Sequence, residues 1–247
     1  MAMTAAILAP DAGPIPTIVL QGVARVYGSG ESEVKALNNI DFTVQQGEFV
    51  ALMGPSGAGK STCLNVLGCL DRPTAGHYFF QGVDVAYLPR EQRALLRRHF
   101  IGFVFQGFNL LNRTTALENV ELPLIYRRVP AAERRKRAFE ALAQVGLKGR
   151  EQHTPGELSG GQQQRVAIAR AIVTKPAVVL ADEPTGNLDT SKSEEIMQLL
   201  TSLNREQGLT IVMVTHSNEI AAFAQREVHF RDGKIAYDRP IAGAQAR

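Results

Sequence analysis

The chain has 247 residues, a net charge of +3 and a hydrophobic content of 45%, the composition of an ordinary globular protein with one domain or a core and a subdomain. Its two cysteines, Cys63 and Cys69, exclude a disulfide-rich fold and a cysteine-based zinc site, and favour a reducing compartment. The basicity is too mild to indicate nucleic acid binding, and no apolar run approaches the roughly 20 residues that span a bilayer.

Residues 1–16 read as a flexible N-terminal tail, because prolines and a glycine interrupt them. Without a basic start, they do not resemble a signal peptide. Strands are expected from Ile18 to Tyr27 and from Ala36 to Val44, on either side of a polar turn. Tyr27 stands just before that turn, where an aromatic ring is able to stack on adenine. From the residue alone, an ordinary edge-strand tyrosine is the better interpretation.

An apolar strand at Phe49–Met53 leads directly into a glycine-rich loop, and a helix follows from Thr62. The loop fits G-x-x-x-x-G-K-S/T and consists of Gly54, Pro55, Ser56, Gly57, Ala58, Gly59, Lys60 and Ser61. Glycines let the loop turn its N–H groups inward, and the positive end of the helix faces the same space. This context predicts a phosphate cradle in which Lys60 reaches the β- and γ-phosphates and the Ser61 hydroxyl ligates Mg²⁺.

Beyond the loop, the pattern predicts short strand pieces within 76–85 and a helix that opens at Pro89. A buried strand, Ile101–Phe105, then stops at Gln106.

From Gln106 onward helices dominate, at Thr115–Tyr126, Ala131–Val145 and Arg165–Val173, with a break at 156–162. The most basic patch of the chain lies here: Arg127, Arg128, Arg134, Arg135, Lys136 and Arg137. We interpret it first as a solvated helix surface, and second as a surface near anionic headgroups.

The last third alternates strand and helix. Ala177–Ala181 is a fully apolar strand followed by Asp182 and Glu183, and Ile211–Val214 is another that closes on Thr215 and His216. Between them, apolar residues at i, i+3, i+4 and i+7 from Ile196 indicate an amphipathic helix. An Asp-Gly pair at 232–233 predicts a hairpin.

Four apolar strands therefore end at residues suited to phosphate chemistry: the glycine loop, Gln106, Asp182 with Glu183, and His216. Apolar strands separated by helices predict a parallel sheet, whose ligands bind beyond the carboxyl ends of the strands. We expect the four sites to converge on one nucleotide. Asp182 would hold Mg²⁺ through water, Glu183 would polarise the attacking water, His216 would bond the γ-phosphate, and Gln106 would contact metal and water.

Leu158-Ser159-Gly160-Gly161-Gln162 is not explained by phosphate chemistry in general; it resembles the signature sequence of ATP-binding cassette (ABC) ATPases. The other motifs fit this family in order. The glycine loop resembles Walker A, Gln106 the Q-loop, 178–183 Walker B with a catalytic Glu183, 187–189 the D-loop, and His216 the switch histidine. Tyr27 matches the A-loop aromatic, which reverses the interpretation given above.

The resemblance implies an α/β P-loop NTPase core at 17–240 with a mostly parallel sheet, an antiparallel β subdomain and a helical subdomain at about 107–173. It implies ATP and Mg²⁺ as ligands. Catalysis would fall to Glu183 and His216, and the metal would be held by Ser61, Gln106 and Asp182. Nucleotide contacts would come from the Walker A residues and from Tyr27, Thr62, Gln106, Ser159, Gly160, Gly161, Gln162 and Asp189.

Within the family, 67–74, 105–111 and 115–120 resemble the MacB/LolD branch, which drives export or lipoprotein release. Ser217 departs from the aspartate usual after the switch histidine. The resemblance implies a peripheral subunit on the cytoplasmic face of the inner membrane. Its expected partners are a separate permease, a second copy packed head to tail, and a periplasmic adaptor reached through the permease.

One other function stays open on these residues, and a further one is disfavoured. An FtsE-like cassette would regulate a membrane partner without moving substrate, and the sequence separates the two poorly. A soluble ABC protein of DNA repair or translation would carry a coiled-coil insert, zinc cysteines or a second cassette, and none is present.

Overall fold

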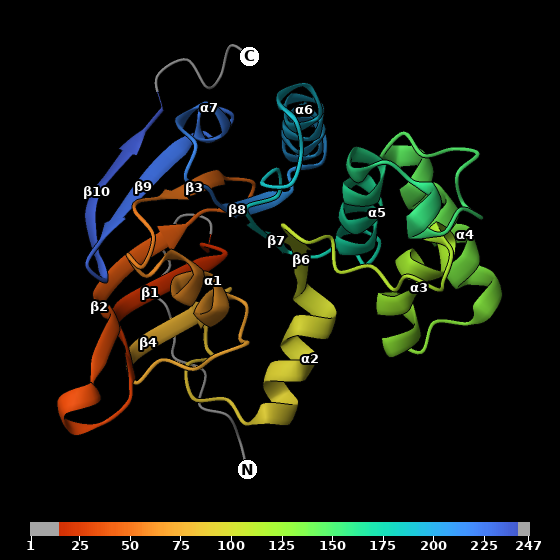
Figure 1. Cartoon of the computed structure of the whole chain (residues 1–247). Coiled ribbons are helices and arrows are strands. Elements are labelled where there is room, and N and C mark those ends of the chain that lie inside the picture. Colours follow the sequence, from red (N-terminus) through yellow and green to blue (C-terminus); the bar gives the residue numbers. More distant parts are fainter. Residues whose placement is uncertain (1–14, 242–247) are drawn as a thin grey trace.

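The computed structural model describes residues 15–241, apart from the side chain of Glu31. The predicted tail at 1–16 lies outside this range except for its last two residues. The described chain folds into two sheets and a group of helices (Figure 1). The predicted α/β fold class is confirmed, including its antiparallel β subdomain.

One sheet is antiparallel and four-stranded, in the order β2-β1-β4-β5. Its strands are β1 (Ile18–Tyr27), β2 (Val34–Val44), β4 (Ala75–Phe80) and β5 (Val83–Asp84), with a short 3-10 turn, η1 (Gly30–Ser32), between the first two. Ile18, Leu20 and Val23 bury their side chains completely or nearly so. This sheet therefore contributes one apolar face to the interior.

The second sheet has six strands in the order β10-β9-β3-β8-β7-β6. They are β3 (Phe49–Met53), β6 (Ile101–Phe105), β7 (Val178–Asp182), β8 (Thr210–Val214), β9 (Arg226–Arg231) and β10 (Lys234–Pro240). All neighbours pair in parallel except β10, which returns antiparallel to β9 through the predicted hairpin. The carboxyl ends of β3, β6, β7 and β8 thus lie along one edge, as their apolar sequences predicted.

The helices are α1 (Lys60–Leu67), α2 (Arg90–Phe100), α3 (Ala116–Tyr126), α4 (Ala131–Gln144), η2 (Pro155–Glu157), α5 (Gly160–Ile172), α6 (Thr190–Gln207) and α7 (Asn218–Ala221). Strand β3 shows why the sheet needs cover on both faces. Val50 and Leu52 join a core with α1 and the antiparallel sheet, whereas Phe49, Ala51 and Met53 join a core with α3 to α6. Alternate side chains of a strand point to opposite faces, so one short strand serves two cores.

Helix α5 begins at Gly160, earlier than the predicted start at Arg165. Ser159 is its N-cap: the Ser159 hydroxyl accepts a hydrogen bond from the Gln162 backbone N–H, and the Gln162 side chain accepts one from the Ser159 N–H. This reciprocal capping offsets the poor helix propensity of two adjacent glycines, which is why the predicted break was too long.

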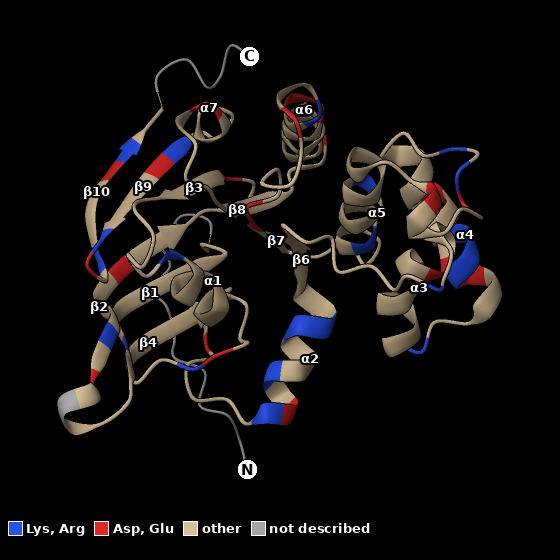
Figure 2. Ribbon diagram, in the orientation of Figure 1, with Lys and Arg blue, Asp and Glu red and all other residues tan. Residues whose placement is uncertain are grey.

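Part of the basic patch lies on α4, where Lys and Arg are blue in Figure 2. The patch is partly structural rather than only a solvated surface. The Arg127 guanidinium donates to the carbonyls of Arg98 and His99, 2.8 and 2.7 Å away, and to that of Thr174 at 2.9 Å. Arg134 pairs with Glu121 at 3.1 Å. Arg127 therefore satisfies orphan carbonyls at the end of α2 and ties α3 to the segment before β7.

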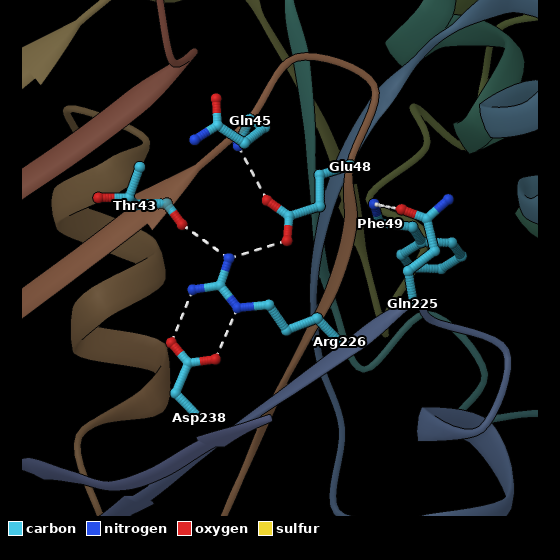
Figure 3. Close-up of polar contacts among 7 residues, drawn as sticks. All are labelled: Thr43, Gln45, Glu48, Phe49, Gln225, Arg226 and Asp238. Carbon is cyan, nitrogen blue, oxygen red and sulfur yellow. Dashed lines mark hydrogen bonds and ion pairs between the residues drawn. The ribbon is translucent and has the colours of Figure 1, made fainter. Parts of the chain in front are cut away.

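Arg226 at the start of β9 pairs with two carboxylates, Glu48 and Asp238 (Figure 3). Its guanidinium donates to both carboxylate oxygens of Asp238 at 2.6 Å, to Glu48 at 2.8 Å and to the Thr43 carbonyl at 2.9 Å. Hydrogen bonding to Asp238 is the main reason that the pKa of Arg226 is raised. The network joins the two sheets, since Thr43 belongs to β2 and Asp238 to β10.

Replacing Arg226 with methionine should lower the free energy of unfolding by about 1–3 kcal/mol, because the half-buried Glu48 and the more exposed Asp238 would lose the charge that compensates them. Urea denaturation followed by circular dichroism measures this. Arg231→Met is the control, since the Arg231 side chain is 77% exposed and pairs only loosely, at 3.8 Å. Equal stability of the two variants would contradict the role given to the network.

Candidate nucleotide-binding site

The glycine loop is wedged between two other segments. A Cβ on Gly54 would lie 2.2 Å from the Phe230 carbonyl oxygen, and one on Gly59 would lie 2.4 Å from the Ala36 carbonyl oxygen. Both glycines have positive φ angles, 135° and 103°, that other residues rarely adopt. Only glycine fits at these two positions. The loop consequently lies directly against β2 and the β9–β10 hairpin.

Lys60, the first residue of α1, is buried, and its side chain folds back over the loop. Its ammonium group donates to the carbonyls of Gly54 and Pro55, both 2.8 Å away. Burial lowers the pKa of Lys60, and the nearby carboxylates of Glu183 and Asp182 oppose that shift. The ammonium is thus held where the loop turns, with acidic groups from β7 as its electrostatic neighbours.

A hollow of about 640 Å³ opens in front of the loop. Eight predicted site residues line it: Ser56, Gly57, Gly59, Lys60, Ser61, Thr62, Glu183 and His216. Five further lining residues were not predicted: Val34, Lys35, Ala36, Asp232 and Gly233. They come from the start of β2 and from the hairpin tip, so no local motif marks them. The fold brings them to the loop through the close backbone contacts described above.

Glu183 follows β7 and faces His216. The His216 Nδ1 atom lies 3.1 Å from a carboxylate oxygen of Glu183. The backbone of Glu183 has a φ angle of 44°, a left-handed conformation that costs a residue with a side chain about 1–3 kcal/mol. Its N–H donates to the Val214 carbonyl at 3.0 Å, which anchors it to β8. Strain of this kind is frequent where a side chain must point in one functional direction.

Asp182, the last residue of β7, is half-buried beside this pair. Burial raises the pKa of Asp182, the adjacent Glu183 raises it further, and Lys60 opposes both. Two neighbouring carboxylates with one ammonium leave an excess of negative charge at the end of β7. Bound cations offset such an excess.

Gln106 does not line the hollow. Its side-chain amide donates to the Asn187 side chain at 3.2 Å, and Asn187 returns a bond to the Gln106 carbonyl at 3.0 Å. Gln106 also covers Gly186, where a Cβ would lie 2.7 Å from the amide nitrogen. Of the four strand ends expected to converge, three contribute to the hollow. The fourth lies beside the turn that follows Glu183.

Ser159, Gly161 and Gln162 line a different hollow of about 370 Å³, together with basic residues that include Lys148 and Arg150. The two hollows share no lining residue. Within one chain, the start of α5 and the glycine loop therefore form separate surfaces.

A sequence profile described as ABC transporter matches residues 37–186, from β2 through the glycine loop and the start of α5 to the turn after Glu183. The chain belongs to the ABC transporter family. ABC cassettes of this family bind and hydrolyse ATP, so the chain is an ABC ATPase, and the predicted enzyme class is confirmed.

Relatives of this ABC ATPase carry two kinds of name. The chain is 53% identical to the uncharacterized ABC transporter ATP-binding protein YvrO of Bacillus subtilis, over 90% of this chain and 96% of that protein. It is 52% identical to the macrolide export ATP-binding/permease protein MacB of Azoarcus sp., again over 90% of this chain but 34% of that protein. The chain thus spans about a third of its MacB relative's length. No helix in the described part of the ABC ATPase has the length and apolarity needed to cross a membrane.

Among solved structures, the ABC ATPase resembles a dimeric post-hydrolysis state of the ATP-binding cassette MJ0796 bound to ADP and Pi. The TM-score is 0.83 and the identity 46%, with 92% of this chain and 99% of that chain covered. This likeness covers both sheets and the helices, so it extends beyond the residues that the family profile matches.

Further predicted site residues of the ABC ATPase, Tyr27 and Asp189 among them, do not line the hollow either. The Tyr27 hydroxyl donates to Asp71 at 2.7 Å, and the Arg25 guanidinium lies 4.3 Å from the ring centroid. Asp189 is the N-cap of α6 and accepts from the Lys192 N–H at 2.8 Å. Ser217, the departure from the family pattern, caps α7 in the same way by accepting from Ile220. A serine replaces an aspartate at a helix N-cap at little cost.

Proposed function

We propose that this ABC ATPase is the nucleotide-binding subunit of a MacB/LolD-type machine and powers a separate membrane permease, for export or lipoprotein release. The observation that carries the proposal is the hollow in which the glycine loop faces Glu183 and His216. The MacB and YvrO relatives support the branch, since the chain matches a third of one and nearly all of the other.

In this proposal the glycine loop N–H groups and Lys60 hold the β- and γ-phosphates of ATP. The Lys60 ammonium already lies at the loop, where it donates to the Gly54 and Pro55 carbonyls. When ATP binds, these hydrogen bonds would be replaced by hydrogen bonds to phosphate oxygens. Glu183 polarises the attacking water, and His216, 3.1 Å from Glu183, bonds the γ-phosphate. Phosphoryl transfer needs positioning and charge neutralisation more than covalent help, and these residues supply both.

The residues also fit a magnesium ion. Ser61 places a hydroxyl in the hollow, and Asp182 contributes a half-buried carboxylate whose pKa is raised by burial and then by the neighbouring Glu183. Oxygen donors of this kind are the usual protein ligands of Mg²⁺. Bound Mg²⁺ would neutralise charge on the β- and γ-phosphates. Gln106 would join only after its amide leaves Asn187, since the two are hydrogen-bonded here.

The remaining partners follow from the same proposal. A second copy would pack head to tail, so that the Ser159 region of each chain closes the hollow of the other; the separation of the two surfaces within one chain supports this.

The complex would lie at the cytoplasmic face of the inner membrane, and a periplasmic adaptor would be reached through the permease. We assign residues 17–240 to the ATPase domain and about 107–173 to its helical subdomain.

The proposed permease contact is the segment Phe108–Leu111, which follows the Q-loop glutamine. Leu111 is 49% exposed and Phe108 is half-buried, whereas Leu110 packs against the core. Phe108 and Asn109 have φ angles of 61° and 50°. Arg170 on α5 donates to both of their carbonyls, at 2.9 and 2.6 Å, and so holds the segment in this shape. An apolar hollow of about 550 Å³ lies beside it.

Purification of the tagged chain from its native membrane should recover a stoichiometric integral membrane protein, identified by mass spectrometry. Serine at both Phe108 and Leu111 should reduce this recovery at least tenfold while ATP affinity stays unchanged, because about 1.4 kcal/mol of lost apolar contact changes binding tenfold. The double variant Ile15→Ser, Val83→Ser is the control, since both side chains are 54% exposed on another face.

Recovery of no membrane protein by the wild-type chain would contradict the proposed function. Equal recovery by the two double variants would instead contradict only the position of the docking segment.

A further inference from the structure

Gln164 is a completely buried polar residue on α5, the helix that Ser159 caps. Its side-chain amide nitrogen donates to the Pro184 carbonyl oxygen at 2.5 Å, across a separation of 20 residues. Among the described residues its side-chain oxygen has no hydrogen-bond partner. Within the described residues, this buried amide therefore makes one hydrogen bond, to the carbonyl of Pro184, the residue that follows Glu183.

The acceptor is equally dependent on this contact. Proline has no N–H, so the carbonyl is the only group through which Pro184 can be hydrogen-bonded. The neighbouring bonds hold the turn at its other points: the Glu183 N–H donates to Val214, and the Gly186 N–H donates to the Glu183 carbonyl, both at 3.0 Å. Without Gln164, the middle of the turn would have no side chain holding it to α5.

This turn carries the strained backbone of Glu183, with its φ angle of 44°. A left-handed residue persists where surrounding contacts fix it, and relaxes when one of them is lost. Rotation about the Glu183 backbone would move its carboxylate away from His216, now 3.1 Å distant. The position of the Glu183 carboxylate therefore depends on the turn at Pro184, which the Gln164 side chain fixes to α5.

We infer that Gln164 is a positioning residue for ATP hydrolysis: it fixes the turn at Pro184 to α5 and thereby aims the Glu183 carboxylate. Ser159 caps the same helix, so Gln164 links α5 and its capped start to the turn that carries the catalytic glutamate. The inference rests on the proposed role of Glu183. Gln164 does not line the hollow in front of the glycine loop, so its effect belongs to kcat rather than to ATP affinity.

The test is steady-state ATP hydrolysis by the full chain carrying Gln164→Met, which preserves length and volume and removes the amide. We expect kcat to fall about 10- to 100-fold, because displacement of a reacting group by about 1 Å has an effect of that size. The dissociation constant of a fluorescent ATP analogue should stay within twofold. The matched control is Asn204→Leu: Asn204 is also buried and donates to the carbonyls of Gly47 and Leu209, far from Glu183. It should lose stability without losing kcat.

A second variant, Gln164→Glu, adds a readout that packing alone would not move. A buried carboxyl group has a raised pKa and, when protonated, can donate to the Pro184 carbonyl as the amide does. Its kcat relative to wild type should therefore recover as the pH falls from 8 to 6, whereas that of Gln164→Met should not.

A kcat of Gln164→Met within twofold of wild type, a matching loss in Asn204→Leu, or the absence of pH-dependent recovery would each overturn the inference. Failure of both Gln164 variants to fold would assign the residue to packing alone and overturn it too. If instead Glu183→Gln hydrolysed ATP normally, the proposed role of Glu183 itself would be wrong, which separates the two failures.

Discussion

Glu183→Gln should bind ATP as the wild type does and hydrolyse it about 10²- to 10⁴-fold more slowly, the usual effect of removing a general base. The glutamine keeps the shape of the side chain and its contact with His216, but it has no carboxylate to polarise water. Because Glu183 does not bind the phosphates in this proposal, the affinity of the variant for ATP should equal that of the wild type. Phosphate release and binding of a fluorescent ATP analogue measure the two properties separately.

Two controls define this result. Lys60→Ala should lose nucleotide affinity as well as hydrolysis, because Lys60 is the buried ammonium of the phosphate loop. Glu194→Gln, on the exposed surface of α6, should keep the wild-type rate. Hydrolysis at the wild-type rate by Glu183→Gln would exclude Glu183 as the base.

The second large effect is a nucleotide-dependent crosslink between chains. In the proposed dimer, Ser159 of one chain reaches the γ-phosphate held at Lys60 of the other, and twofold symmetry gives two equal sites from one interface. The helix start capped by Ser159 suits an anion, as does the start of α1. ADP lacks the γ-phosphate, so it should not stabilise the closed arrangement.

The experiment places cysteines at Ser159 and Ser56 in the Glu183→Gln background and adds a short thiol crosslinker. The native cysteines should not interfere, because burial raises the pKa of the Cys63 thiol to about 12 and that of Cys69 to about 11. We expect a covalent dimer with ATP and almost none with ADP. A chain carrying Ser202→Cys in place of Ser159→Cys, on the far part of α6, is the control. Crosslinking within one chain, or equally with both nucleotides, would rule out the sandwich arrangement.

Local sequence was sufficient for the parts of this protein whose physical cause is local. Short apolar runs flanked by glycines and polar residues predicted β3, β6, β7 and β8, because buried parallel strands need apolar side chains on both faces. The glycine loop was predicted from its own residues and flanks. Its convergence with Glu183 and His216 also followed from sequence, since the carboxyl ends of parallel strands share one edge.

What the sequence left undetermined depends on contacts between distant residues. Lys35 and Asp232 line the hollow only because β2 and the hairpin press against the glycine loop, and no spacing encodes that contact. Arg127 belonged to a basic run typical of solvated surface, yet it binds carbonyls from two other segments. Gln106 was placed on the correct edge, but the orientation of its amide follows from Asn187, 81 residues away. The sequence thus determined, through periodicity and turn residues, which polar side chains follow the carboxyl end of each strand. The tertiary structure decided where each side chain points, because that depends on which partners the packed backbone brings within hydrogen-bonding distance.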